Sequence, residues 1–242
     1  MPKTWLILFD LDGTLAPVGE PIPAAVCRQL TKLQDAGHIL AICSGKPLYY
    51  LTGLVRQAGL EDFWLIGENG ATLQWGAQLP PQYFQILLTD AAIEKQLQAL
   101  KVAARHQFKT DVWFQPNDVC CTLFFKQASL REQMGKWLKA YLNKHPFLDL
   151  EVVEHADSFD ISPVGMNKGT ALYSLKRQLK ELGIALAGTI AVGDHWNDVP
   201  MLQAADVGYL LPGDVAKQEP KGVHLVASLD EAFQLMWEQM LS

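Results

Sequence analysis

Two carboxylates separated by one residue follow an apolar run near the start of the chain. Asp10 and Asp12 come directly after Trp5 to Phe9, and Gly13 and Thr14 follow them. If the apolar run is a strand, the chain turns at these carboxylates, and open α/β sheets bind ligands at the carboxyl ends of their strands. Paired acids at such a place could bind a cation, attack an electrophile or move a proton. An acidic solvated turn is the simpler alternative, and the residues that flank the pair argue against it.

A hydroxyl residue and a glycine precede a helix-like segment. Ser44-Gly45-Lys46 follow the apolar run 38–43, and Pro47 stands where the first helical residue is expected. The unbonded backbone N–H groups at a helix N-terminus and the helix dipole both favour an anion, so this segment could hold a phosphate. A serine that only caps the helix is the alternative.

Two more polar groups occur in the last third of the chain. Lys168 begins another helix-like segment and could present a point charge to a phosphate, although an isolated lysine is more often on the surface. Asp194 and Asp198 follow the apolar run 189–192, and oxygen ligands of this kind suit Mg²⁺. His195 could titrate near neutral pH, but Mg²⁺ prefers oxygen and the neighbouring acids supply the chemistry without the imidazole.

These four groups each adjoin the end of a predicted core strand, and together they provide what phosphoryl transfer requires. The Asp10 carboxylate could attack phosphorus and form an aspartyl-phosphate, which splits one displacement into two easier ones. Asp12 could protonate the leaving alkoxide and later deprotonate the attacking water. Mg²⁺ and Lys168 would neutralise the charge on the phosphate oxygens.

The elements that must hold these residues alternate along the chain. Short runs rich in β-branched and aromatic residues alternate with segments of helical period, which is the pattern of a parallel sheet covered by helices. The alternation weakens after the prolines at 80 and 81 and returns from Asn167, so the sequence predicts one α/β core interrupted by an α+β insert. The predicted core strands are 5–9, 38–43, 63–66, 189–192, 207–210 and 224–226, and the predicted core helices are 22–37, 47–59, 168–182, 198–204 and 229–241. In the insert we expect helices at 90–106 and 129–144, the latter capped by Ser129, and strands at 119–125, 150–153 and 158–161.

Composition excludes several classes of partner. The 242 residues carry 20 Lys and Arg against 26 Asp and Glu, a formal net charge of −6, and 49% of the side chains are hydrophobic. Nucleic-acid and membrane-surface binding both need concentrated positive charge, so neither partner is expected. No apolar run approaches the roughly 20 residues that cross a bilayer, and no signal-peptide pattern precedes the first strand, so we expect a cytoplasmic protein. The four cysteines form no CxxC pair and are expected to be buried thiols.

The motifs resemble those of the haloacid dehalogenase-like (HAD) phosphatase superfamily. The resemblance rests on Asp10-Leu11-Asp12-Gly13-Thr14, Ser44, Lys168 and the segment 193–198, which occur in the family's order over nearly the whole core. The long gap between Ser44 and Lys168 is similar to the branch with a C2-type cap, which includes Cof-like, sucrose-phosphate and mannosyl-3-phosphoglycerate phosphatases. The resemblance implies a Rossmann-like doubly wound parallel sheet formed by residues 1–80 and 160–242, with an inserted α+β cap at 81–159.

The resemblance also implies a role for each matching residue. Asp10 would be the nucleophile and Asp12 the general acid and base. Thr14, Ser44, Gly45 and Lys168 would bind the phosphate; Asp10, the Asp12 carbonyl and Asp194 would bind Mg²⁺, supported by Asn197 and Asp198; and Lys46, Glu68 and Asn69 are candidate substrate contacts. Many relatives have arginine where this chain has Lys46, and lysine keeps the charge but lacks the planar fork that makes bidentate contacts.

The favoured hypothesis is a Mg²⁺-dependent phosphatase acting on a small phosphorylated metabolite, either a sugar phosphate or a phosphoglycerate derivative. A phosphomutase using the same intermediate is the main alternative, but the insert lacks the arginine pattern expected of phosphomannomutases. A non-catalytic phosphate-binding regulatory protein would be expected to lose Asp10, Asp12 or Asp194, and all three are present. A response-regulator-like receiver pairs similar acids with a lysine, but the insert fits it poorly. Trp113 and Trp137 fit either a dimer surface or internal packing.

Overall fold

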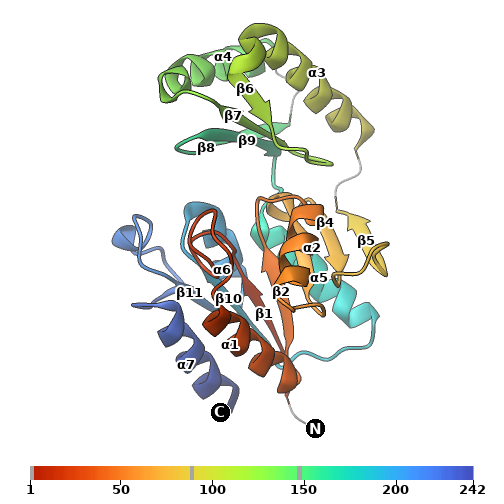
Figure 1. Cartoon of the computed structure of the whole chain (residues 1–242), viewed down its shortest axis with the longest axis vertical. Helices are drawn as coiled ribbons and strands as arrows, with labels where there is room; N and C mark the ends of the chain where they lie inside the picture. The colour runs from red at the N-terminus through yellow and green to blue at the C-terminus, as the bar shows by residue number, and fades with distance from the viewer. Residues whose placement is uncertain (1–2, 88–89, 146–148, 242) are drawn as a thin grey trace. The chain divides into compact units, whose positions relative to one another are not determined.

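The chain forms two compact units, one of which is built from both of its ends. The computed structural model describes residues 3–87, 90–145 and 149–241. The core unit contains the chain up to Leu87 and again from Asn167, and the inserted unit is the segment between them. Figure 1 shows the first and last parts of the chain side by side in the core unit, because β10 of the last part pairs with β1 of the first part in one sheet.

The core unit is organised around a sheet of eight strands, counted within the described residues. Its central strand β1 (Trp5–Phe9) reads Trp-Leu-Ile-Leu-Phe, and all five residues are buried. A parallel strand covered on both faces does not alternate between apolar and polar residues, which explains the continuous apolar runs in the sequence. The strand order is β12-β11-β10-β1-β2-β3-β4-β5, and the other bounds are β2 Ile39–Cys43, β3 Trp64–Gly67, β4 Thr72–Trp75, β5 Tyr83–Ile86, β10 Gly188–Gly193, β11 Val207–Leu210 and β12 His224–Leu225.

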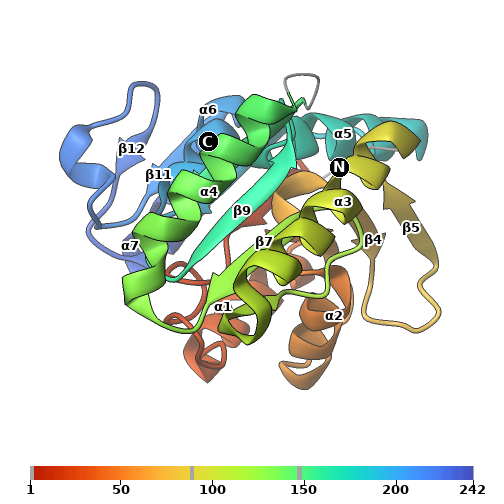
Figure 2. The ribbon, with the colours of Figure 1, turned by 90° about the horizontal axis from the view of Figure 1, so that it is seen from above.

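Helices cover both faces of the core sheet. Their bounds are α1 Ala24–Asp35, α2 Leu48–Gln57, α5 Lys168–Glu181, α6 Val199–Ala204 and α7 Leu229–Leu241. Ile7 of β1 lies in the apolar cluster with α1, α2 and α7, whereas its neighbour Leu8 lies in the cluster with α5 and α6. Figure 2 shows α1 and α2 on one side of the sheet and α5 and α6 on the other. Among the described residues, no helix combines the length and apolar composition that a bilayer crossing requires.

Two antiparallel strands, β4 and β5, extend the core sheet beyond β3. They place the boundary between the core unit and the insert later in the chain than the sequence predicts. β4 pairs with β5 over the registers Thr72 to Ile86 and Trp75 to Tyr83. Two prolines interrupt the alternation of strands and helices at residues 80 and 81, and they predict that the insert begins at residue 81. The core unit instead continues to Leu87, because the backbone of β5 is hydrogen-bonded into the core sheet.

The inserted unit is a separate sheet with helices on one face. Its strands, in the order β6-β7-β9-β8, are all antiparallel. Leu100, Leu138 and Leu123 share one apolar cluster that joins both helices to the sheet. The expected return to the core at residue 160 falls inside β9, whose pairing partners among the described residues are β7 and β8 of the insert. The bounds are α3 Ala91–Phe108, β6 Val112–Phe114, β7 Cys121–Phe125, α4 Arg131–Lys144, β8 Leu150–Glu154 and β9 Ser158–Pro163.

Some local expectations differ from the structure. Pro47 is the N-cap of α2 and not its first residue, because its ψ of 156° lies in the extended region. Ser129 does not cap α4; it lies inside a short 3₁₀ helix that leads directly into α4 at Arg131. Three of the cysteines are buried as expected, and Cys27 is half-buried. Short 3₁₀ helices also occur at η2 Lys109–Asp111, η3 Ala128–Leu130 and η5 Ala216–Gln218.

Candidate active site

The predicted site residues follow three neighbouring strands of the core sheet. Asp10 follows β1, Ser44 follows β2 and Asp194 follows β10, and these strands lie side by side in the order β10-β1-β2. Phe9 is in register with both neighbouring strands near their ends, so the chain leaves the sheet at the same edge three times. Lys168 enters the same region as the first residue of α5, and the Asn167 side chain caps that helix.

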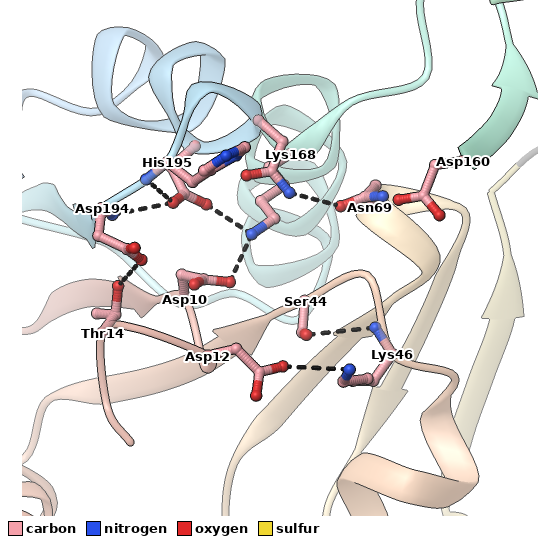
Figure 3. A network of polar contacts seen from close by, with 12 residues as sticks. Asp10, Asp12, Thr14, Ser44, Lys46, Asn69, Asp160, Lys168, Asp194 and His195 are labelled. Carbon is pink, nitrogen blue, oxygen red and sulfur yellow. Dashed lines mark hydrogen bonds and ion pairs between the residues drawn. The ribbon is translucent and has the colours of Figure 1, made fainter. Parts of the chain in front are cut away.

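Lys168 joins two of the acids from the centre of the site. Its Nζ lies 2.5 Å from Asp10 Oδ1 and 2.5 Å from Asp198 Oδ1 (Figure 3). All three side chains are almost completely inaccessible, with 1% of the lysine, 8% of Asp10 and none of Asp198 exposed. Lys168 therefore provides the positive charge between two carboxylates, which a surface lysine could not do.

Asp198 is fixed by backbone groups as well as by the lysine. Its Oδ2 accepts hydrogen bonds from the backbone N–H groups of Asp194 at 3.0 Å and His195 at 2.9 Å. These donors belong to the turn that leads into η4 (Trp196–Asp198), so the carboxylate closes the same turn that carries Asp194. The structure thus gives the backbone of His195 a role in holding Asp198.

The acids outnumber the cation, and their pKa values reflect this imbalance. Burial, followed by the charge of Asp198, raises the pKa of Asp10 to about 8, although Lys168 opposes the shift. Burial and Asp198 also raise the pKa of Asp194. Burial alone would lower the pKa of Lys168, but Asp10 and Asp198 outweigh it and the pKa is raised. A further positive charge at this site would stabilise the ionised carboxylates.

The acidic group fits a small hard cation. Oxygen atoms of Asp10, Asp194 and Asp198 all lie within 4.8 Å of one another. Gly13 has a φ of +91°, and a Cβ built on it would collide with the Asp194 carboxylate, so glycine at this position lets the carboxylate pack against the backbone of the loop. Carboxylate and carbonyl oxygens are the ligands that Mg²⁺ takes, so the residues fit this metal.

The predicted phosphate-binding residues have specific partners. The Thr14 hydroxyl donates a hydrogen bond to Asp194 Oδ1 at 2.9 Å, so it orients an acid. The Ser44 hydroxyl accepts a hydrogen bond from the backbone N–H of Lys46 at 3.2 Å. Gly45 lies beside Asn69, whose side-chain nitrogen would be 3.3 Å from a Cβ at position 45. The structure therefore brings Ser44 and Gly45 to the same edge as Asp10, with Asn69 next to them.

Of the candidate substrate contacts, Lys46 and Asn69 are partly exposed and Glu68 is buried. Lys46 and Asp12 form an ion pair of 3.4 Å and keep 31% and 24% of their side chains exposed. Glu68 and Asn69 lie in η1 (Glu68–Gly70) and have φ values of +54° and +55°, which non-glycine residues rarely adopt. Glu68 is 1% exposed. The amide of Asn197 donates to Asn69 Oδ1 at 3.2 Å, so Asn197 connects this turn to the Asp194 turn.

Comparison with known proteins identifies the family. A family model described as haloacid dehalogenase-like hydrolase matches residues 7–108 and 90–212. The chain belongs to this family. The expected Rossmann-like core with an inserted cap domain is confirmed, because the crystal structure of a haloacid dehalogenase-like hydrolase from Bacteroides thetaiotaomicron superposes with a TM-score of 0.74 at 17% identity, over 99% of this chain and 100% of that one.

Curated relatives of this haloacid dehalogenase-like hydrolase are phosphatases. The chain is 27% identical over 212 residues to the phosphoglycolate phosphatase of Methanoculleus marisnigri, a match that covers 84% of this chain and 81% of that protein. It is 26% identical over 242 residues to the HMP-PP phosphatase of Yersinia pestis, covering 85% of this chain and 83% of that protein. The prediction of a phosphoric monoester hydrolase is confirmed at the level of the family.

Two glycines of the hydrolase contribute to the site but were not among the predicted site residues. Gly13 leaves room for Asp194, as described above, and a Cβ on Gly193 would come within 2.5 Å of the Asp198 Cβ. Both glycines could have been recognised from the sequence, because each stands directly next to a predicted site aspartate at a strand end. A residue with no side chain at such a place indicates that another group approaches the backbone closely.

Proposed function

We propose that this protein is a Mg²⁺-dependent phosphatase that hydrolyses a small phosphorylated metabolite through an aspartyl-phosphate on Asp10. The observation that carries the proposal is the buried Lys168, which lies 2.5 Å from both Asp10 and Asp198 at the strand ends. A buried carboxylate next to a fixed cation is arranged to react with an anionic phosphate, because the cation offsets the repulsion between them.

In the first step, an Asp10 carboxylate oxygen attacks phosphorus. The bond from phosphorus to the leaving-group oxygen breaks, and its electron pair remains on that oxygen. The Asp12 carboxyl gives its proton to the same oxygen, so that the leaving group departs as an alcohol. The phosphoryl group is then held on Asp10 as an acyl phosphate.

In the second step, a water oxygen attacks phosphorus and the bond between phosphorus and the Asp10 oxygen breaks. The Asp12 carboxylate takes a proton from that water, which restores the protonated acid for the next cycle. The electron pair of the broken bond returns to the Asp10 carboxylate. The sum of both steps is hydrolysis of one phosphate ester by one water molecule.

The other site residues would hold the phosphate and the metal. Lys168 pairs with Asp10, and Ser44 and Gly45 follow the neighbouring strand β2 at the same sheet edge, so these three residues would bind the oxygens of the phosphate that do not leave. Asp10, the Asp12 carbonyl and Asp194 would bind Mg²⁺, with Asn197 and Asp198 holding the surrounding turn. When bound, Mg²⁺ supplies positive charge that offsets the charge of the phosphate oxygens.

We further propose a sugar phosphate or a phosphoglycerate derivative as the substrate, and a cytoplasmic location for the reaction. The names of two curated relatives, a phosphoglycolate phosphatase and an HMP-PP phosphatase, support small phosphorylated compounds. The inserted unit would act as the cap that selects the leaving group, while the core unit performs the chemistry. Neither nucleic acid nor membrane is proposed as a partner.

The test is phosphate release from a panel of phosphorylated metabolites in the presence of Mg²⁺. We expect one metabolite to be hydrolysed far faster than the rest, and both Asp10→Asn and EDTA to abolish that activity. Activity that survives Asp10→Asn would exclude the aspartyl-phosphate. Isomerisation of a sugar phosphate without phosphate release would instead identify a phosphomutase.

A further inference from the structure

The Asp12 side chain is held on both of its oxygens. Oδ1 accepts a hydrogen bond from the backbone N–H of Gly19 at 3.2 Å. Oδ2 lies 3.4 Å from the Lys46 ammonium, as Figure 3 shows. Gly19 belongs to the loop that follows Asp12 in the chain, whereas Lys46 comes from the loop after the neighbouring strand β2. The carboxylate is therefore fixed between two separate loops of the core unit.

Lys46 is itself fixed at the backbone. Its N–H donates to the Ser44 hydroxyl at 3.2 Å, and its carbonyl accepts from the Glu68 N–H at 3.0 Å. A Cβ added to Gly67 would lie 3.0 Å from the Lys46 carbonyl oxygen, so the neighbouring strand packs closely against this carbonyl. These contacts set the point from which the lysine side chain extends, and that side chain ends at Asp12.

The ion pair between Lys46 and Asp12 is too exposed to contribute much to the stability of the fold. About a third of the Lys46 side chain and a quarter of the Asp12 side chain are accessible, at 31% and 24%. Ion pairs with this exposure contribute little to folding, because water screens the charges. The Lys46 ammonium also lies 5.9 Å from the centre of the Tyr50 ring, a contact that favours a cation at this place.

We infer that Lys46 is a positioning residue for Asp12: it holds the carboxyl that exchanges a proton with the leaving group. The inference rests on the proposed function, in which Asp12 is the general acid and base. It differs from the sequence-based expectation that Lys46 contacts the substrate, and the two roles have different kinetic consequences. A positioning residue affects proton transfer to the leaving group, whereas a substrate contact affects every substrate that carries the contacted group.

A positioning residue and a substrate contact can be distinguished by how strongly the effect of the substitution on kcat/KM depends on the leaving group. Phenyl phosphate and p-nitrophenyl phosphate have the same phosphate and nearly the same size. Phenolate is a much stronger base than p-nitrophenolate, so its departure depends far more on a proton from Asp12. The ratio of kcat/KM for phenyl phosphate to kcat/KM for p-nitrophenyl phosphate therefore measures how well the acid is positioned in the first step.

The experiment measures this ratio, with saturating Mg²⁺, for the wild type, Lys46→Met and Lys46→Arg. General acid catalysis contributes about 10²–10⁴-fold, and we expect misplacement of the acid in Lys46→Met to lower the ratio by about tenfold. Lys46→Arg keeps a cation near Asp12 and should restore most of the ratio. Thermal unfolding identifies any loss of folded protein, and Lys46→Gln provides a second neutral variant.

Lys217→Met is the matched control, because Lys217 also pairs with an aspartate in the core unit, at 2.7 Å from Asp214, but on the open surface. It should leave the ratio unchanged. Equal losses on both esters in Lys46→Met, or no loss on either, would overturn the inference while leaving the proposed function intact. A wild type that hydrolyses neither ester would overturn the proposed function, and this inference with it.

Discussion

Replacement of Lys168 by methionine tests whether the lysine holds the acids together. Lys168→Met keeps a long side chain but removes the charge from a position that is 1% exposed, beside two buried carboxylates at 2.5 Å. Removal of one partner from a buried ion pair costs about 3–5 kcal/mol. For a chain of this length each kcal/mol corresponds to about 2–4 °C, so we expect the unfolding temperature to fall by about 6–20 °C in the metal-free protein.

The loss of stability caused by Lys168→Met should be larger at high pH than at low pH. The pKa of Asp10 is raised by burial from 3.8 to about 8 in the folded protein, so the folded state binds this proton more tightly than the unfolded chain does. Protonation of Asp10 therefore stabilises the fold at low pH, and the contribution is lost as the pH rises towards 8. Without Lys168 the ionised Asp10 is less well compensated, so Lys168→Met should be destabilised more at pH 8.5 than at pH 5.5.

The assay is thermal unfolding followed by circular dichroism, in EDTA and then with Mg²⁺. Addition of Asp198→Asn to Lys168→Met should recover part of the loss, because it removes one of the uncompensated charges. Mg²⁺ should stabilise Lys168→Met by binding the folded protein. An unfolding temperature within about 2 °C of the wild type at pH 8.5 in EDTA would refute the reasoning that Lys168 compensates the buried acids.

Three further predictions concern single positions. Gly13→Ala should weaken Mg²⁺ binding, measured by calorimetry, by at least about tenfold (about 1.4 kcal/mol), because the new Cβ would collide with Asp194; unchanged affinity would exclude a metal at this place. Asn69→Gly should be more stable than Asn69→Ala by about 1 kcal/mol in urea unfolding, because φ at this position is +55°, and equal stability would show that the turn relaxes. The pKa of Asp206 is lowered by its hydrogen bond with Thr189, so the stability advantage of the wild type over Asp206→Ala should be present above about pH 4 and disappear as the pH falls below it; an advantage that does not change with pH would contradict the shift.

The core could be predicted from the sequence because its strands are short and apolar on both faces. β1 and β10 appear as continuous apolar runs, and their neighbouring helices have clear helical periods. The strands at the other edge were missed for a physical reason: β4 buries two polar residues, Thr72 and Gln74, so it shows no apolar run. Gln74 is satisfied there by hydrogen bonds to Thr52 and to the Gly76 carbonyl, partners that the local sequence does not reveal.

The location of the candidate site residues at one sheet edge could be predicted, but the contacts between them could not. Asp10, Ser44 and Asp194 could be placed at one sheet edge because parallel strands end together. The sequence did not predict that Thr14 would bind an acid, or that Lys168 would lie between Asp10 and Asp198, because these contacts join segments up to 180 residues apart. Such contacts depend on how the loops fold against one another, and residue spacing does not contain that information.

The central position of β1 has a consequence for synthesis of the chain. β1 pairs on one side with β2, which follows it closely, but its other neighbour is β10, which begins only at Gly188. The ribosome adds about 5–20 residues per second, so the edge of β1 that pairs with β10 remains unpaired for on the order of 10–40 s during synthesis. An unpaired strand edge is a template for aggregation, so we expect the nascent chain to be most prone to aggregation before β10 has emerged.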